Sequence, residues 1–114
     1  MKYHVIYPSG KIKSGEWAEN DTTLYQQWKG VVDGFPELAS VLYEGKPATL
    51  VVNDRGAVED KAINPAGVLP PNARATAIYW TATIIGRTGV TFAPLTSPMI
   101  HGTAILIEKD KREL

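Results

Sequence analysis

The order of hydrophobic and polar positions predicts that the chain opens with a β-hairpin. Residues 2–7 alternate between the two classes, with Tyr3, Val5 and Tyr7 on one face, which is typical of a half-buried strand. A Pro-Ser-Gly turn follows, and residues 11–17 form a second strand-like run. Two such runs joined by a short turn indicate an antiparallel pair.

The pattern then changes to a helical period. Apolar side chains recur on one side of the next segment, at Leu24, Trp28, Val31 and Val32. This spacing predicts a helix over residues 22–33, with Asn20 or Asp21 as its N-cap. Gly34 is expected to supply the left-handed conformation that ends the helix.

The second half of the chain predicts another hairpin, another helix and a last strand. Residues 38–43 and 48–53 are β-type runs around a four-residue loop that contains glycine. A helix is expected over residues 73–84, and residues 100–107 are apolar on both faces near their end, as a central strand would be.

These elements together indicate an α+β fold, in which a mostly antiparallel sheet of about five strands is covered by one or two helices. A length of 114 residues fits one domain, expected over residues 1–108, with a charged C-terminal tail at residues 109–114.

Charge and cysteine content exclude several classes of partner. Twelve basic and twelve acidic residues cancel, so no general field draws the protein to a nucleic-acid polymer or an anionic membrane. The absence of cysteine excludes disulfides, thiolate metal sites and cysteine nucleophiles. The N-terminal sequence has too short an apolar run for a signal peptide, and a cytoplasmic location is expected.

Catalytic and metal-binding motifs are not apparent in the sequence. The two histidines, His4 and His101, fall in different predicted strands and lack metal-ligand spacing. Ser14 precedes a glycine, which is interpreted as turn chemistry rather than a nucleophile elbow. We therefore expect a protein that is not an enzyme and that uses no metal or cofactor.

The segment LPPNARAT, residues 69–76, raises a question of charge. Asn72 is a good N-cap after two prolines, which places Arg74 in the first turn of the predicted helix. The helix dipole disfavours a cation at that end, so Arg74 requires a nearby anion. One interpretation is a structural ion pair with an acidic side chain elsewhere, such as Glu37, Asp54 or Glu59. The other is a role in binding a ligand.

The surroundings of Arg74 favour an anionic ligand in the second interpretation. No Asp or Glu occurs from Ile63 to Leu106, whereas hydroxyl and aromatic side chains are frequent there. Arginines, hydroxyls and a helix N-terminus are the groups that bind phosphate. The predicted ligand-binding residues are Asn72, Arg74, Thr76, Arg87 and His101.

Three stretches resemble a family of small domains encoded by phages, plasmids and other mobile elements, mainly of Gram-positive bacteria. The family pattern is a V-N-(D/E)-x-G turn, an L-P-x-N-x-R-A-T segment and a glycine before the last strand. The matching residues are Val52, Asn53, Asp54, Gly56, Leu69, Pro70, Asn72, Arg74, Ala75, Thr76 and Gly102. The resemblance spans residues 1–107, and residues 57–68 and 84–99 depart from it. It implies a mobile-element setting and transfers no catalytic residue.

The sequence thus predicts a non-catalytic protein that sequesters a small anionic, nucleotide-like ligand to counter host defence. The alternative is a module that blocks a host protein through residues 88–100, a proline-broken apolar segment. Such a segment is also expected to make a homo-oligomer interface, with contacts from Phe92, Leu95 and Met99.

Overall fold

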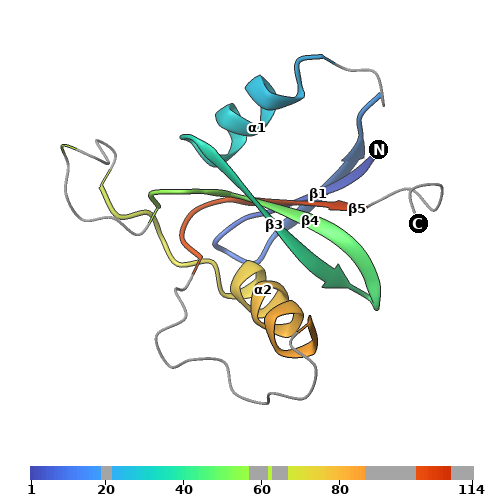
Figure 1. Cartoon of the computed structure of the whole chain (residues 1–114). Helices are drawn as coiled ribbons and strands as arrows, with labels where there is room; N and C mark the ends of the chain where they lie inside the picture. The colour runs from blue at the N-terminus through green and yellow to red at the C-terminus, as the bar shows by residue number, and fades with distance from the viewer. Residues whose placement is uncertain (19–21, 57–61, 63–66, 87–99, 109–114) are drawn as a thin grey trace.

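The fold is an antiparallel sheet of five strands with one helix on each face (Figure 1). The structure is a computed structural model that describes residues 1–18, 22–56, 62, 67–86 and 100–108. For residues 81–86 it describes the backbone only. The elements in chain order are β1 (Lys2–Ile6), β2 (Ile12–Glu16), α1 (Leu24–Val32), β3 (Pro36–Tyr43), β4 (Lys46–Asn53), α2 (Ala73–Gly86) and β5 (Ala104–Glu108). The strand order across the sheet is β2-β1-β5-β4-β3.

This architecture confirms the predicted α+β class and both hairpins. β1 pairs with β2, β3 pairs with β4, and β5 lies between β1 and β4, antiparallel to each. The central place of β5 explains why its sequence is apolar on both faces. Ala104, Ile105 and Leu106 are all buried, because a helix covers each side of the sheet at this strand.

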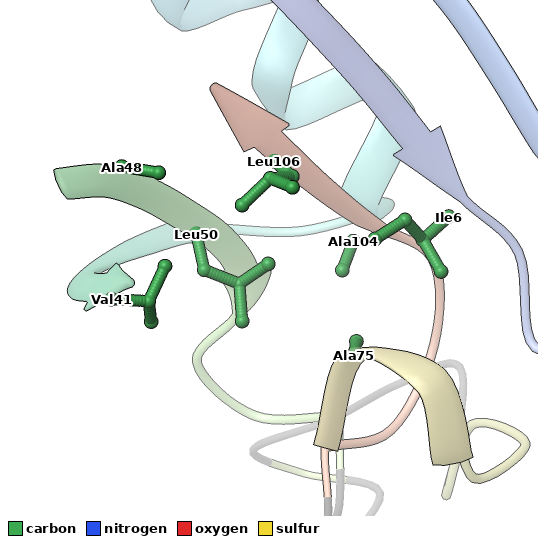
Figure 2. Packing of buried hydrophobic residues seen from close by; sticks show 7 residues of the cluster. All are labelled: Ile6, Val41, Ala48, Leu50, Ala75, Ala104 and Leu106. Carbon is green, nitrogen blue, oxygen red and sulfur yellow. The ribbon is translucent and has the colours of Figure 1, made fainter. Parts of the chain in front are cut away.

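Each face of the sheet has its own hydrophobic cluster. On the α2 face, alternate residues of four strands meet the first turns of the helix, and Figure 2 shows Ala75 of α2 near Ile6 and Ala104. The buried members are Ile6, Val41, Ala48, Leu50, Ala75, Ala104 and Leu106. On the α1 face the buried members are Val32, Val51, Ile105 and Ile107.

Helix α1 differs at both ends from the sequence-based prediction. It begins at Leu24 after Thr23, whose hydroxyl accepts a hydrogen bond from Gln27 Nε2 at 2.8 Å rather than capping a backbone amide. The left-handed residue at its C-terminus is Asp33, with a φ of 58°, and not Gly34. Aspartate tolerates this region better than most side chains. The predicted caps Asn20 and Asp21 lie outside the described residues.

The turn between β3 and β4 is also tighter than predicted. It consists of Glu44 and Gly45, with φ values of 52° and 77°. Two consecutive residues with positive φ make a type I′ turn, whose twist matches that of an antiparallel hairpin. Pro47 consequently belongs to β4, where it pairs with Leu42.

Asn72 joins α2 to the sheet. Its Oδ1 accepts a hydrogen bond from the Ala75 amide at 3.1 Å, which confirms the prediction that Asn72 is the N-cap of this helix. Its Nδ2 donates to the carbonyls of Ile6 and Gly102, each at 2.9 Å. One fully buried side chain therefore ties the start of α2 to the end of β1 and to the segment before β5.

Asn53 has a similar role at the end of α1. Its Nδ2 donates to the carbonyls of Val32 and Asp33, at 3.1 and 3.0 Å, so it satisfies acceptors that the helix itself leaves free. Its Oδ1 accepts from the Arg55 amide at 2.8 Å and forms the following turn.

Neither helix, over the residues described, is long and apolar enough to cross a lipid bilayer.

Candidate ligand-binding site

A cavity of about 250 Å³ lies on the α1 face, between that helix and the β1–β2 end of the sheet. Strand alternation brings its lining together, since Tyr3 and Val5 of β1 both point to the face of the sheet that α1 covers, where Val31 also lines the cavity. The polar and aromatic lining residues are Tyr3, Tyr7, Lys13, Trp17, Gln27 and Thr103.

Hydrogen-bond donors dominate the polar part of this lining. Lys13 supplies an ammonium group, and Tyr7 and Thr103 supply hydroxyls. None of these three side-chain groups is hydrogen-bonded to another part of the described chain. No Asp or Glu is among the described residues that line the cavity. The cavity therefore presents positive charge and unused donors to a ligand.

One wall of the cavity is aromatic. The rings of Tyr3 and Trp17 are stacked, with centroids 3.9 Å apart and planes 15° from parallel. Gly15 makes room for this stack, because a Cβ there would lie 2.7 Å from Tyr3 Cζ. Trp28 of α1 also packs on Trp17, with centroids 6.3 Å apart and planes tilted by 53°. A stacked aromatic pair thus forms part of the wall of this donor-rich cavity.

A second cavity, of about 220 Å³, lies on the α2 face and has the opposite character. Glu37, Asp54 and His101 are its ionisable lining residues, together with Tyr79. His101 Nδ1 is 2.7 Å from the Leu69 carbonyl, which can only accept, so Nδ1 carries the hydrogen. The other nitrogen of the neutral ring is then an acceptor. Two carboxylates and this nitrogen make the cavity unfavourable for an anion.

The residues predicted to bind the ligand do not gather around either cavity as a set. Asn72 and Thr76 are buried, with their side-chain hydrogen bonds made within the protein. The Thr76 hydroxyl donates to the Asn72 carbonyl at 2.7 Å and accepts from the Ile100 amide at 2.9 Å. Both side chains hold the backbone around the start of α2.

Arg74 lies on the exposed side of the first turn of α2. Among the described residues, close contacts between a basic side chain and a carboxylate join His4 to Glu108 and Arg55 to Asp54, and neither Glu37 nor Asp54 pairs with Arg74. The third predicted partner, Glu59, lies outside the described residues. Of the predicted ligand-binding residues that the structure describes, His101 alone lines one of the two cavities, the acceptor-rich one.

The remaining predicted residues lie outside the part of the chain that the structure describes. They are Arg87 of the ligand set and the interface residues Phe92, Leu95 and Met99. Residues 88–99 of the predicted interaction segment 88–100 also lie outside the described residues. Its last residue, Ile100, packs against the hydrophobic cluster on the α2 face.

The donor-rich cavity is not predicted by the sequence pattern, although part of its lining is. The prediction that Tyr3 and Val5 share one face of a strand is confirmed, and Tyr7, just after the end of β1, lines the same cavity. What the pattern did not reveal is that Thr103 and Lys13 share that face, because this depends on the pairing of β1 with both β5 and β2.

Comparison of the chain with protein-family models, with curated proteins and with solved structures finds no match.

Proposed function

We propose that the protein binds a small anionic, nucleotide-like ligand in the cavity between α1 and the β1–β2 end of the sheet, without turning it over. The observation that carries this proposal is the pairing of a donor-rich, acid-free lining with the Tyr3–Trp17 stack in one cavity. A phosphate needs cationic and hydroxyl donors, and a base needs an aromatic face.

The expected mode of binding follows from these groups. The base extends the stack on the side of Tyr3, and the phosphate faces Lys13, with Tyr7 and Thr103 as further donors. A volume of about 250 Å³ is below that of pockets for drug-sized ligands, so a mononucleotide would be held partly outside it. The described lining contains no histidine or carboxylate to act as a general base, which favours sequestration over turnover.

The setting follows from the resemblance to mobile-element domains. A protein made in the cytoplasm of a bacterial host, and able to withdraw a small signalling nucleotide, would counter a host defence that depends on that nucleotide. This proposal keeps the ligand class expected from the sequence. It moves the binding site from the start of α2 to the opposite face of the sheet.

Calorimetric titration with a panel of mononucleotides tests the proposal. Adenosine and inorganic phosphate, each titrated alone, separate the contributions of the base and the anion. We expect a nucleotide to bind more tightly than either fragment. The change of Lys13→Met keeps the length of the side chain and removes its charge, and it should weaken binding about tenfold or more.

Lys11→Met is the matched control, because Lys11 is an exposed lysine just before β2 that does not line the cavity. It should leave the affinity unchanged. Binding that is lost equally in both variants would indicate a general charge effect. Failure of every nucleotide to bind the wild-type protein would refute the proposal.

A further inference from the structure

Three side chains from three strands form a hydrogen-bonded chain on the α2 face of the sheet. His4 of β1 lies between Ser14 of β2 and Glu108 of β5. His4 Nδ1 is 2.6 Å from Ser14 Oγ, and His4 Nε2 is 2.8 Å from Glu108 Oε2. Ser14 therefore lies within β2, inside the strand predicted over residues 11–17, and its interpretation as turn chemistry is wrong.

The direction of these hydrogen bonds follows from the groups involved. The Glu108 carboxylate can only accept, so Nε2 of His4 carries the hydrogen that it donates. In the neutral ring Nδ1 is then an acceptor, and it receives the hydroxyl hydrogen of Ser14. A hydroxyl that donates to a base, with the base oriented by a third group, is the arrangement of an activated nucleophile.

Strand pairing leaves Ser14 open to an incoming molecule. The Tyr7 amide donates to the Lys11 carbonyl and the Trp17 amide to the Met1 carbonyl, each at 2.9 Å. Because antiparallel pairs alternate, His4 and Ser14 form a non-hydrogen-bonded pair, in which the side chains are close and the Ser14 amide points away from β1. β2 is at the edge of the described sheet, so this N–H points to its open side.

An apolar side chain borders the serine, and an aromatic ring borders its histidine partner. Ile12, two residues away on the same face of β2, has 41% of its surface exposed. The ring of Tyr43 lies on the other side of His4, with its centroid 5.8 Å from that of the imidazole. A short apolar acyl group could rest on Ile12 while its carbonyl carbon meets Ser14 Oγ.

We propose that Ser14 is a nucleophile that takes an acyl group from a small activated ester, with His4 as the general base and Glu108 as a positioning residue. Ser14 Oγ bonds to the carbonyl carbon as its proton moves to His4 Nδ1. The ester C–O bond then breaks, and the leaving alcohol takes that proton. The products are acyl-Ser14 and the free alcohol, with no oxidant or further reactant. The Ser14 amide can donate to the oxyanion that forms transiently.

Incubation of the whole protein with p-nitrophenyl acetate, followed by peptide mass mapping, tests this proposal. We expect acetyl-Ser14 to form about 100-fold faster than acetylated Ser9 or Ser40 of the same molecules. Ser9 lies in a turn, where its hydroxyl accepts a hydrogen bond from the Lys11 amide at 3.3 Å, and Ser40 lies on β3. Because the three serines are compared within the wild-type protein, the result does not depend on the folding of any variant.

Variants then assign the roles. His4→Gln can hydrogen-bond both neighbours but cannot take a proton, and it should slow acetylation of Ser14 about 100-fold. Glu108→Gln should slow it less, because the ring can still be oriented by the amide oxygen, and Glu108→Ala should slow it more. Ser9→Ala should leave the rate unchanged. Acetylation of Ser14 no faster than that of Ser9, or a rate unaffected in a folded His4→Gln protein, would overturn the proposal.

Discussion

The side-chain amide of Asn72 donates a hydrogen bond to the carbonyl of Ile6, 66 residues earlier in the chain, at 2.9 Å. The same amide group reaches the Gly102 carbonyl, so the first strand, the second helix and the approach to the last strand meet at one buried side chain. Buried polar groups of this kind are stabilising only while every partner is present.

Asn72→Ala should lower the free energy of unfolding by about 2–4 kcal/mol, because it removes the helix cap and two buried donors. Asn72→Asp is a sharper test. It keeps the cap acceptor and the shape of the side chain, but it turns an oxygen toward the two carbonyls, and it should be at least as harmful. Chemical denaturation measures both, and an Asp variant as stable as wild type would contradict the assigned orientation.

The Thr76 hydroxyl links α2 to the Ile100 amide. Thr76→Val keeps the shape and removes the hydroxyl, and it should cost about 1–3 kcal/mol. Thr76→Ser keeps the hydroxyl and should be milder. Thermal unfolding of the two variants compares them directly, and a larger loss in Thr76→Ser than in Thr76→Val would show that packing of the methyl group matters more than the hydrogen bond.

Gly56 approaches the chain before β5 so closely that a side chain does not fit. A Cβ at this position would lie 2.7 Å from the His101 carbonyl oxygen. Gly56→Ala should therefore destabilise the fold by about 1–3 kcal/mol. Gly30 of α1 is the control, since a Cβ there meets nothing within 4 Å. Gly30→Ala should stabilise the protein by about 1 kcal/mol through helix propensity, as measured by denaturation.

Most of the fold could be predicted from local patterns, but the site could not. Paired β-type runs joined by short turns predict the two hairpins, and the apolar run of β5 predicts a central strand, because these signals lie in neighbouring residues. The roles of Asn72 and Thr76 depend on carbonyls and amides far away in the chain. The Ser14–His4–Glu108 chain is not predictable from local patterns for the same reason, since Glu108 is brought near His4 only by the β1–β5 pairing.

A substitution of Arg74 distinguishes a ligand site at the start of α2, which the sequence predicts, from the proposed site in the donor-rich cavity. Arg74 is exposed and has no ion pair with a described carboxylate, so Arg74→Ala should change the free energy of unfolding by less than about 0.5 kcal/mol. Nucleotide affinity should also stay the same, because Arg74 does not line the donor-rich cavity. Calorimetry on this variant decides the matter. A loss of nucleotide binding without a loss of stability would show that the ligand binds at the start of α2 and not in the donor-rich cavity.

The most direct measurement for the central claim is an NMR titration of the isotope-labelled protein with the best-binding mononucleotide. Binding in the donor-rich cavity predicts the largest amide shift changes at Tyr3, Lys13 and Val31, together with a shift of the Trp17 indole N–H. Amides around Tyr79 and His101, on the opposite face, should stay close to their free positions. Changes confined to Tyr79, His101 and the start of α2, with the α1 face unaffected, would contradict the account.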